Sequence, residues 1–177
     1  MRQKKCKICK EQFTPIRPLQ FVCSAQCGYE YAKLQKQKAW KKEKKERKEK
    51  LMTRSDHLNL LQKVFNAYIR KRDEGKPCIS CGTQAKVQYD AGHYRSVGAH
   101  PELRFNEKNV HRQCRKCNSY WGGNLIEYRK GLIQRIGENK VIELELNDHP
   151  PLKLNTDEIK EKIKYYRELT KSIANKL

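Results

Sequence analysis

Residues 109–118, "NVHRQCRKCN", contain a pair of cysteines separated by two residues. The same spacing occurs upstream in "CISC", residues 78–81, and 32 residues separate the two pairs. A C-x2-C turn brings two thiolates to one metal at about 2.3 Å each, so two such pairs complete a tetrahedral zinc shell. Free thiols and an iron–sulfur cluster are the alternatives, but two well-separated pairs suit zinc better. We therefore expect a closed, structural zinc site with the ligands Cys78, Cys81, Cys114 and Cys117.

A second set of four cysteines opens the chain. The segments "CKICKEQF" and "FVCSAQC", residues 6–13 and 21–27, look like the two halves of a small zinc ribbon or treble clef. Four thiolates again leave no open coordination position for a substrate or a water molecule. The sequence predicts a second structural zinc site in a ribbon at residues 1–30, with the ligands Cys6, Cys9, Cys23 and Cys27.

The composition explains why metal is needed. Apolar residues make up 37% of the 177 residues, below the roughly 45–50% of ordinary globular domains, so a large single core is not expected. No apolar signal segment opens the chain, and no run of about 18 apolar residues could cross a membrane. We therefore expect a protein of a reducing cytoplasm, where thiolates bind metal rather than form disulfides.

The formal charge of +20 makes a polyanion the expected partner. Nucleic acid is the first candidate, because counterion release would drive binding, and no apolar face or lipidation signal points to a membrane. Residues 1–54 contain seventeen Lys/Arg and five Asp/Glu, so they hold +12 of the +20. We expect a basic helical linker at residues 31–55, with a disordered linker as the alternative. Its candidate DNA contacts are Lys41, Lys42, Lys44 and Lys45.

The linker also has acidic residues at helical spacing. Glu43–Arg47 and Glu46–Lys50 are spaced i, i+4 with the acid first, which is the stabilising order.

The remaining residues, 56–177, form the predicted main domain. Helical apolar spacing predicts amphipathic helices at 56–74, 124–136 and 157–174. The first begins at Ser55 or Asp56 and ends at Gly75, and the second ends at Gly137. Residues 141–146 fit either a short helix or a strand.

The polar stretch between the two cysteine pairs of the main domain has no apolar periodicity. If the zinc holds the base of a hairpin, residues 90–93 end one strand, residues 109–113 form the other, and Asn118 begins a helix. This arrangement would bring His93, Asn109 and Asn118 to one cleft. Histidine is the natural general base near pH 7, and amide or carboxylate oxygens suit Mg²⁺ at a phosphate.

These residues resemble a known family. The pattern C-x2-C … H … N-x-H-x2-C-x2-C-N is similar to the zinc-containing ββα-metal hairpin of HNH nucleases. The segments "CISCGT", "DAGHYR", "LRFNEKNVHRQCRKCN" and "GNLIEYRKGLIQRIG", with "CKICKEQFTP" near the start, more specifically resemble the phage lambda NinG (Rap) recombination proteins. The resemblance covers nearly the whole chain and is weakest between residues 141 and 155.

The resemblance implies an α+β fold, in which helices flank a zinc-stapled ββα core of the HNH or treble-clef type. It also implies a phage-encoded, Mg²⁺-dependent endonuclease in the host cytoplasm, acting on branched DNA such as Holliday junctions and D-loops. Other recombination proteins would be further partners. Symmetric junction cleavage would call for a homodimer, although no dimer seam is legible in the sequence.

Site roles follow from the same pattern. His93 would activate water, Asn118 would bind the catalytic metal, and Asn109 would brace the loop that carries His93. Typical HNH enzymes have an acidic ligand directly before the base, but this chain has Gly92 there; we expect the glycine to form a tight turn that presents His93. Asp90 is the best substitute ligand, and His111 could reach the metal or the leaving oxygen.

Structural roles are the alternatives for these residues. His93 would be a hydrogen-bonding residue beside the zinc, Asp90 a turn residue and His111 a structural histidine. For the whole protein, the alternatives are a non-catalytic zinc protein that binds DNA, favoured by Gly92, and an RNA-binding module, which lacks the expected aromatic stacking pattern. The basic residues expected to hold phosphates, or else to be only solvated, are Arg95, Arg104, Arg112, Arg115 and Lys116.

Overall fold

The computed structural model describes residues 2–175, which form two compact units, residues 2–52 and 53–175. Each unit contains one set of four cysteines. Both units contain helices and a two-stranded sheet, so the α+β class is confirmed. In the described residues no helix is long and apolar enough to cross a membrane.

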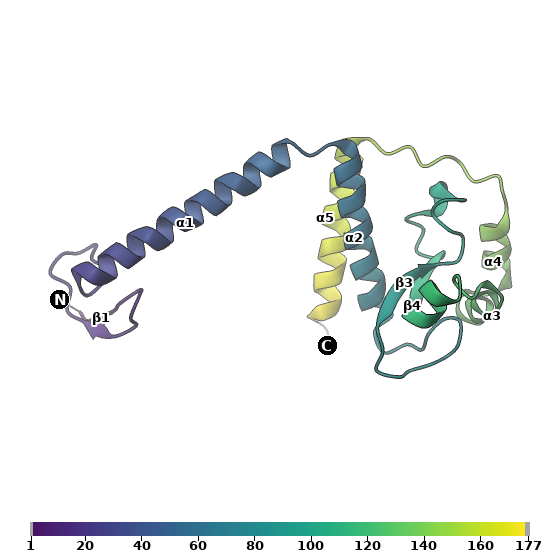
Figure 1. Ribbon diagram of the computed structural model, residues 1–177, viewed down its shortest axis with the longest axis horizontal. Helices are drawn as coiled ribbons and strands as arrows, with labels where there is room; N and C mark the ends of the chain where they lie inside the picture. The colour runs from purple at the N-terminus through teal and green to yellow at the C-terminus, as the bar shows by residue number, and fades with distance from the viewer. Residues whose placement is uncertain (1, 176–177) are drawn as a thin grey trace. The chain divides into compact units, whose positions relative to one another are not determined.

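The first unit is a short hairpin followed by one long helix (Figure 1). Strands β1 (Lys4–Lys5) and β2 (Gln12–Phe13) pair antiparallel, and helix α1 spans Ala25–Lys50. The Ser24 side chain caps α1 by accepting from the backbone N–H of Cys27. The helix therefore begins inside the cysteine cluster, so the predicted ribbon and basic helix are continuous rather than separated at residue 30.

Helix α1 has no buried residue, and its 26 residues make it about 39 Å long. The predicted pair Glu43–Arg47 is present at 2.5 Å. Glu46 instead pairs with Lys42, at 3.9 Å. Exposed pairs of this kind stabilise a helix by only about 0.3–0.5 kcal/mol, so the helix depends mainly on the propensity of its residues.

Three layers make up the second unit (Figure 1). Helices α2 (Arg54–Arg72) and α5 (Thr156–Ala174) pack side by side and run in the same direction. The middle layer is the antiparallel hairpin of β3 (Tyr89–His93) and β4 (Val110–Cys114). Helices α3 (Leu125–Ile136) and α4 (Glu138–Glu145) form the third layer, while the short helical turns Pro101–Leu103 and Lys116–Tyr120 precede and follow β4.

Two apolar clusters hold these layers together. The larger joins α2 and α5 to one face of the hairpin through residues such as Phe65, Val110 and Tyr166. The smaller joins the cysteine turn at residues 78–81 to α3 and α4 through Ile79, Tyr128 and Leu144, among others. Helix α3 also reaches the hairpin directly, because the Tyr128 hydroxyl donates to the Gly92 carbonyl.

The predicted helices are confirmed, with two differences at their ends and one ambiguity removed. Helix α2 begins earlier than expected, because Thr53 forms a reciprocal capping box with Asp56, and its cap at the other end is Asp73 rather than Gly75. Residues 141–146 belong largely to helix α4, since Val141 and Leu144 are buried on one side of it.

Candidate functional site

The cysteine cluster of the second unit has the geometry of a zinc site. The sulfur atoms of Cys78, Cys81, Cys114 and Cys117 lie within 4.8 Å of one another, and those of Cys81 and Cys114 are 3.8 Å apart. A tetrahedral ion with bonds of about 2.3 Å requires sulfur separations of about 3.8 Å. Three of these cysteines are buried, so the four thiolates could hold zinc and leave no position for a substrate.

The cluster of the first unit has the same sulfur spacing but less cover. Its four sulfurs also lie within 4.8 Å of one another, with Cys9 and Cys23 3.5 Å apart and Cys23 and Cys27 3.7 Å apart. Only Cys6 is buried. This set could hold a second zinc ion, again with a closed shell.

Gln113 links the two cysteine turns of the second unit. Its amide group is fully buried and donates to the Ser80 hydroxyl at 2.7 Å and to the Gly123 carbonyl at 2.6 Å. The same side chain lies against Gly92 on the paired strand, where an added Cβ atom would be 2.1 Å from the Gln113 Oε1 atom. Gly92 is therefore explained by this close approach inside β3, and the tight turn expected from the sequence is wrong.

A pocket of about 450 Å³ opens where β3 ends. His93 and Arg95 line it from the hairpin side, while Asn118 and Gly122 line it from the segment after β4. The expected convergence of His93 and Asn118 is therefore confirmed. Asn109 does not line the pocket, because its side chain is fully buried behind it.

Asn109 braces the loop after β3, as predicted. Its Oδ1 atom accepts from the Arg95 backbone N–H at 2.8 Å, and its Nδ2 atom donates to the Arg95 carbonyl at 3.0 Å. A further bond joins Nδ2 to the Leu103 carbonyl at 3.2 Å. Asn109 thus fixes the chain two residues beyond His93.

His93 has the hydrogen bonding of a neutral base. Its Nε2 atom lies 3.0 Å from the Arg104 carbonyl, which can only accept, so Nε2 carries the proton in the neutral ring. The Nδ1 atom then has the lone pair that can take up a proton. Burial lowers the pKa of His93 below its ordinary value, against the opposing effect of the Arg104 carbonyl. The imidazole is consequently neutral at pH 7.

Asp90 reaches the same site through Asn118. The Asn118 Nδ2 atom is 3.4 Å from the Asp90 carboxylate, and Asp90 pairs with Gln113 across the hairpin. Asn118 lines the pocket and Asp90 lies behind it, so an amide and a carboxylate, both capable of offering oxygen to a metal, are adjacent. Among the described residues, only the two cysteine clusters bring the ligand atoms of three or more His, Cys, Asp or Glu side chains within 4.8 Å of one another.

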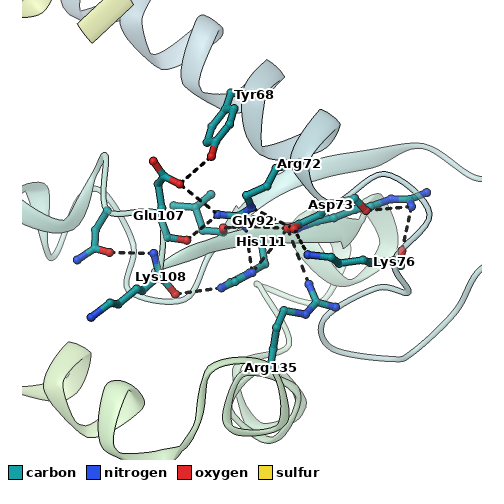
Figure 2. A network of polar contacts seen from close by, with 12 residues as sticks. Tyr68, Arg72, Asp73, Lys76, Gly92, Glu107, Lys108, His111 and Arg135 are labelled. Atoms are coloured by element: carbon teal, nitrogen blue, oxygen red, sulfur yellow. Dashed lines mark hydrogen bonds and ion pairs between the residues drawn. The ribbon is translucent and has the colours of Figure 1, made fainter. Parts of the chain in front are cut away.

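His111 lies in a buried polar network, away from the pocket lining (Figure 2). Its Nδ1 atom is 3.1 Å from the Arg72 guanidinium, which can only donate. The Nε2 atom is 3.0 Å from the Lys108 carbonyl, which can only accept. Both ring nitrogens are therefore engaged, and burial lowers the pKa of His111. The prediction that His111 reaches a metal or a leaving oxygen is wrong, and its alternative structural role holds.

Asp73 is the centre of that network (Figure 2). Its fully buried carboxylate lies 2.7 Å from Arg72, 2.9 Å from Lys76 and 3.9 Å from Arg135. Burial alone would raise the pKa of Asp73, but its contacts with His111 and Arg72 outweigh burial and hold this pKa well below its usual range. The network joins the end of α2 to β4 and α3.

Few of the predicted phosphate ligands lie at the pocket. Arg95 lines it, and its guanidinium also approaches Asn147 at 3.3 Å. Arg104 bonds Gln62 at 2.6 Å and lines a different pocket, whereas Arg112 bonds the Lys76 carbonyl at 2.9 Å. Both side chains are therefore engaged away from the pocket, although the backbone of Arg104 lies against His93. Arg115 and Lys116 are exposed and line a third cavity.

The sequence did not reveal the residues that support this site from behind. Asp73 looked like an ordinary helix end, Gln113 like a strand residue, and Tyr128 like a core residue of α3. The Tyr128 hydroxyl donates to the Gly92 carbonyl at 2.8 Å, directly before His93. The sequence gives no signal for contacts such as Tyr128–Gly92, Gln113–Ser80 and Asp73–His111, because each joins residues more than 30 positions apart.

Comparison with known proteins decides the family. The family model described as "Bacteriophage Lambda NinG protein" matches residues 1–176. This chain belongs to the NinG family. It is 39% identical to the protein ninG of Escherichia phage lambda over 193 aligned positions, covering 98% of this chain and 94% of that protein.

Other NinG relatives have similar sequence identities to this chain. The protein ninG of Salmonella phage P22 is 40% identical over 178 positions, covering 89% of this chain and 87% of the relative. The protein ninG of Escherichia phage 933W is 42% identical over 163 positions, covering 82% and 81%. No solved structure matches this NinG-family chain.

Proposed function

We propose that this NinG-family protein is a DNA endonuclease that uses a divalent metal to cleave branched DNA. The observation that carries the proposal is the pocket in which His93 and Asn118 meet. His93, Asn118 and Arg95 line this pocket together, the Asp90 carboxylate lies 3.4 Å from the Asn118 amide nitrogen, and the protein has a net charge of +20. A phosphodiester is the electrophile that this combination suits.

Each residue has a defined task in the proposed reaction. The Nδ1 atom of His93 takes the proton from the attacking water, while the Arg104 carbonyl holds the ring in the tautomer that leaves Nδ1 free. Arg95 is available to a phosphate oxygen. Asp90 and Asn118 would hold Mg²⁺, which when bound stabilises the charge that develops on the phosphate.

The preference for branched DNA rests on the resemblance to HNH and NinG (Rap) proteins and on the distribution of charge. A junction presents several duplex arms, and this chain has basic residues in two separate compact units. The long exposed helix α1 would contact phosphates over much of a duplex turn, because about 39 Å exceeds the turn length of roughly 34–36 Å. The second unit would then cleave the DNA.

A non-catalytic DNA-binding function is the second candidate. It is favoured by Gly92, which lacks a side chain where HNH enzymes have an acidic metal ligand, and by the contact that prevents one from fitting there. In this alternative the pocket would bind a phosphate without cleaving it. DNA affinity would then be independent of Mg²⁺.

The deciding experiment compares cleavage of a four-way junction and a linear duplex, each with and without Mg²⁺. The wild-type protein should cut the junction only with the metal. His93→Ala should lower the rate roughly 10²–10⁴-fold, because a general base acts mainly in the transition state. Its zinc content and junction affinity should remain unchanged. His149→Ala, outside this pocket, is the matched control.

The pH dependence provides an independent readout. The base must be unprotonated, so kcat/KM falls as the pH drops through the pKa of His93. Because burial lowers that pKa, the midpoint of the acid limb should lie below the ordinary value of 6.5. If His93→Ala cleaves the junction at the wild-type rate, His93 is not the base. If the wild-type protein leaves the junction intact with every metal tested, the non-catalytic DNA-binding function is favoured.

A further inference from the structure

The turn after the second cysteine pair exposes two adjacent aromatic side chains. Tyr120 is 80% exposed and Trp121 is 52% exposed. Leu125 and Ile126, at the start of α3, are also exposed apolar residues. Large apolar side chains that gather on a surface, rather than occur singly, mark interaction sites.

The backbone of this turn is held in place. The backbone N–H of Trp121 donates to the Lys116 carbonyl at 3.0 Å, and that of Gly123 donates to the Cys117 carbonyl, also at 3.0 Å. Gly122 and Gly123 have positive φ values of 55° and 90°, which glycine adopts without strain. The aromatic rings therefore project from a turn anchored directly to the cysteine cluster, which reduces the entropy lost when a ligand binds them.

Trp121 also lines a cavity of about 320 Å³. This volume is at the lower end of the roughly 300–1,000 Å³ typical of small-ligand sites. The cavity has an apolar side formed by Val87 and Trp121 and a basic side formed by Arg115 and Lys116. The Lys116 ammonium lies 4.5 Å from the centre of the Trp121 ring. A flat apolar ligand attached to an anion fits this combination.

The cavity adjoins the candidate active site along the chain. Trp121 lines the cavity, whereas the next residue, Gly122, lines the pocket that contains His93. A DNA strand whose phosphate lies in the pocket could therefore place a neighbouring base against the aromatic turn.

We propose that the turn Lys116–Gly123 is a binding site for an unpaired nucleobase of the DNA. Trp121 and Tyr120 stack on the base, while Arg115 and Lys116 bind the adjacent phosphates. Aromatic stacking accepts any base, because every base has a π face. The inference rests on the proposed function and extends it, since unpaired or splayed bases distinguish a branch point from a continuous duplex.

Two DNA ligands separate base binding from charge. One is a duplex with a single extrahelical adenine, and the other is the same duplex with an abasic nucleotide at that position. Binding is measured without Mg²⁺, so that cleavage does not enter. Trp121→Ala should weaken binding of the adenine-containing duplex at least about 5-fold, the lower limit for losing one stacked base. Its affinity for the abasic duplex should remain that of wild type.

Fluorescence tests the contact directly. The chain has two tryptophans, Trp40 and Trp121, so Trp40→Phe leaves Trp121 as the only one. Its emission should be quenched by the adenine-containing duplex and much less by heparin, a polyanion without bases. Tyr165→Ala removes an aromatic residue of similar exposure from α5 and is the matched control for affinity. Trp121→Phe should retain most of the affinity, and zinc content verifies the fold of each variant.

Specific results would overturn the inference. Equal losses of affinity for the two duplexes in Trp121→Ala, or equal quenching by heparin, would show that the turn binds no base. If the protein binds both duplexes but cuts no junction, the proposed cleavage fails while the base site stands. If it cuts the junction but binds neither duplex, the base site fails while the proposed cleavage stands.

Discussion

The two cysteine clusters have the same ligands but lie in opposite surroundings. In the second unit, three of the four cysteines are buried, and the apolar clusters around Phe65 and Tyr128 pack nearby. In the first unit only Cys6 is buried, the strands are two residues long, and helix α1 has no buried residue. A bound metal ion would therefore add to an existing core in the second unit, whereas in the first unit it would take the place of a core.

This difference suggests a division of work. The second unit holds its candidate site rigid through buried contacts such as those of Asn109 and Gln113. The first unit holds little beyond its cluster and presents an exposed rod of positive charge. The proposed bond cleavage would need precise geometry, whereas binding along a phosphate backbone tolerates looser geometry.

Loss of a zinc ligand should produce the largest difference between the two units. Cys6→Ser should release one of two zinc ions and remove amide-exchange protection from residues 2–30, because apparent zinc-binding energies of about 10–16 kcal/mol are folding energy in such domains. Helices α2 and α5 should keep their protection.

The reciprocal variant Cys114→Ser should release the other zinc ion and loosen the hairpin, while residues 2–30 stay protected. Persistent protection of residues 2–30 in Cys6→Ser would show that the first unit has a stabilising core after all, and would break the comparison.

Asp73→Asn should sharpen the comparison of the two units, since the second unit also depends on buried charge. Removing the carboxylate leaves Arg72, Lys76 and Arg135 without their shared partner, which should cost about 3–5 kcal/mol in the free energy of unfolding. Denaturant unfolding of the 177-residue protein measures the loss of stability, and amide exchange in α2 locates it. Asp157→Asn, on the surface of α5, should change stability by less than about 0.5 kcal/mol.

The pH dependence of the same variant has a defined sign. The pKa of Asp73 is lower in the folded state than its ordinary value of 3.8, so its stabilising effect is present above that pH and is lost as the pH falls further. Asp73→Asn should therefore unfold with a weaker acid dependence than wild type. An unchanged acid transition would exclude a stabilising role for this ion cluster.

The smallest effect is expected from surface charge. Replacing Lys41, Lys42, Lys44 and Lys45 by Gln should reduce the magnitude of the log–log salt slope of duplex binding by up to about 3.6, at about 0.9 for each phosphate that is no longer neutralised. The matched control replaces four lysines of α5, namely Lys160, Lys162, Lys164 and Lys171. Equal changes in slope for both variants would mean that α1 has no special part in DNA binding.

The sequence predicted the elements well because their signals are local. Cysteine spacing indicated both clusters, and apolar periodicity indicated α2, α3 and α5. The ends of α2 were less well predicted, because several residues near Thr53 can cap a helix and only the folded chain selects one. The exposed aromatic turn was also missed, since Tyr120 and Trp121 have no periodic pattern around them.

The site was predicted only in part, for a related reason. His93 and Asn118 belong to a recognisable pattern, and the structure brings them together. The roles of His111 and Arg112 depended on which buried partners the fold supplies, and Asp73 lies more than 35 positions before either residue. Distant charge pairing leaves no mark on local sequence.

The contact between Gly92 and Gln113 makes these two positions interdependent. Introducing aspartate at position 92, to provide the acid that HNH enzymes have there, would drive its Cβ atom into the Gln113 side chain. Shortening Gln113 to alanine is insufficient, because the Gln113 Cβ atom is itself 2.9 Å from the added atom. Only a glycine at 113 would make room, and that change would release Ser80 and Gly123 from their shared partner. Either single replacement is expected to be harmful. Evolution toward an acidic residue at position 92 would therefore pass through single mutants that are less fit than the present protein.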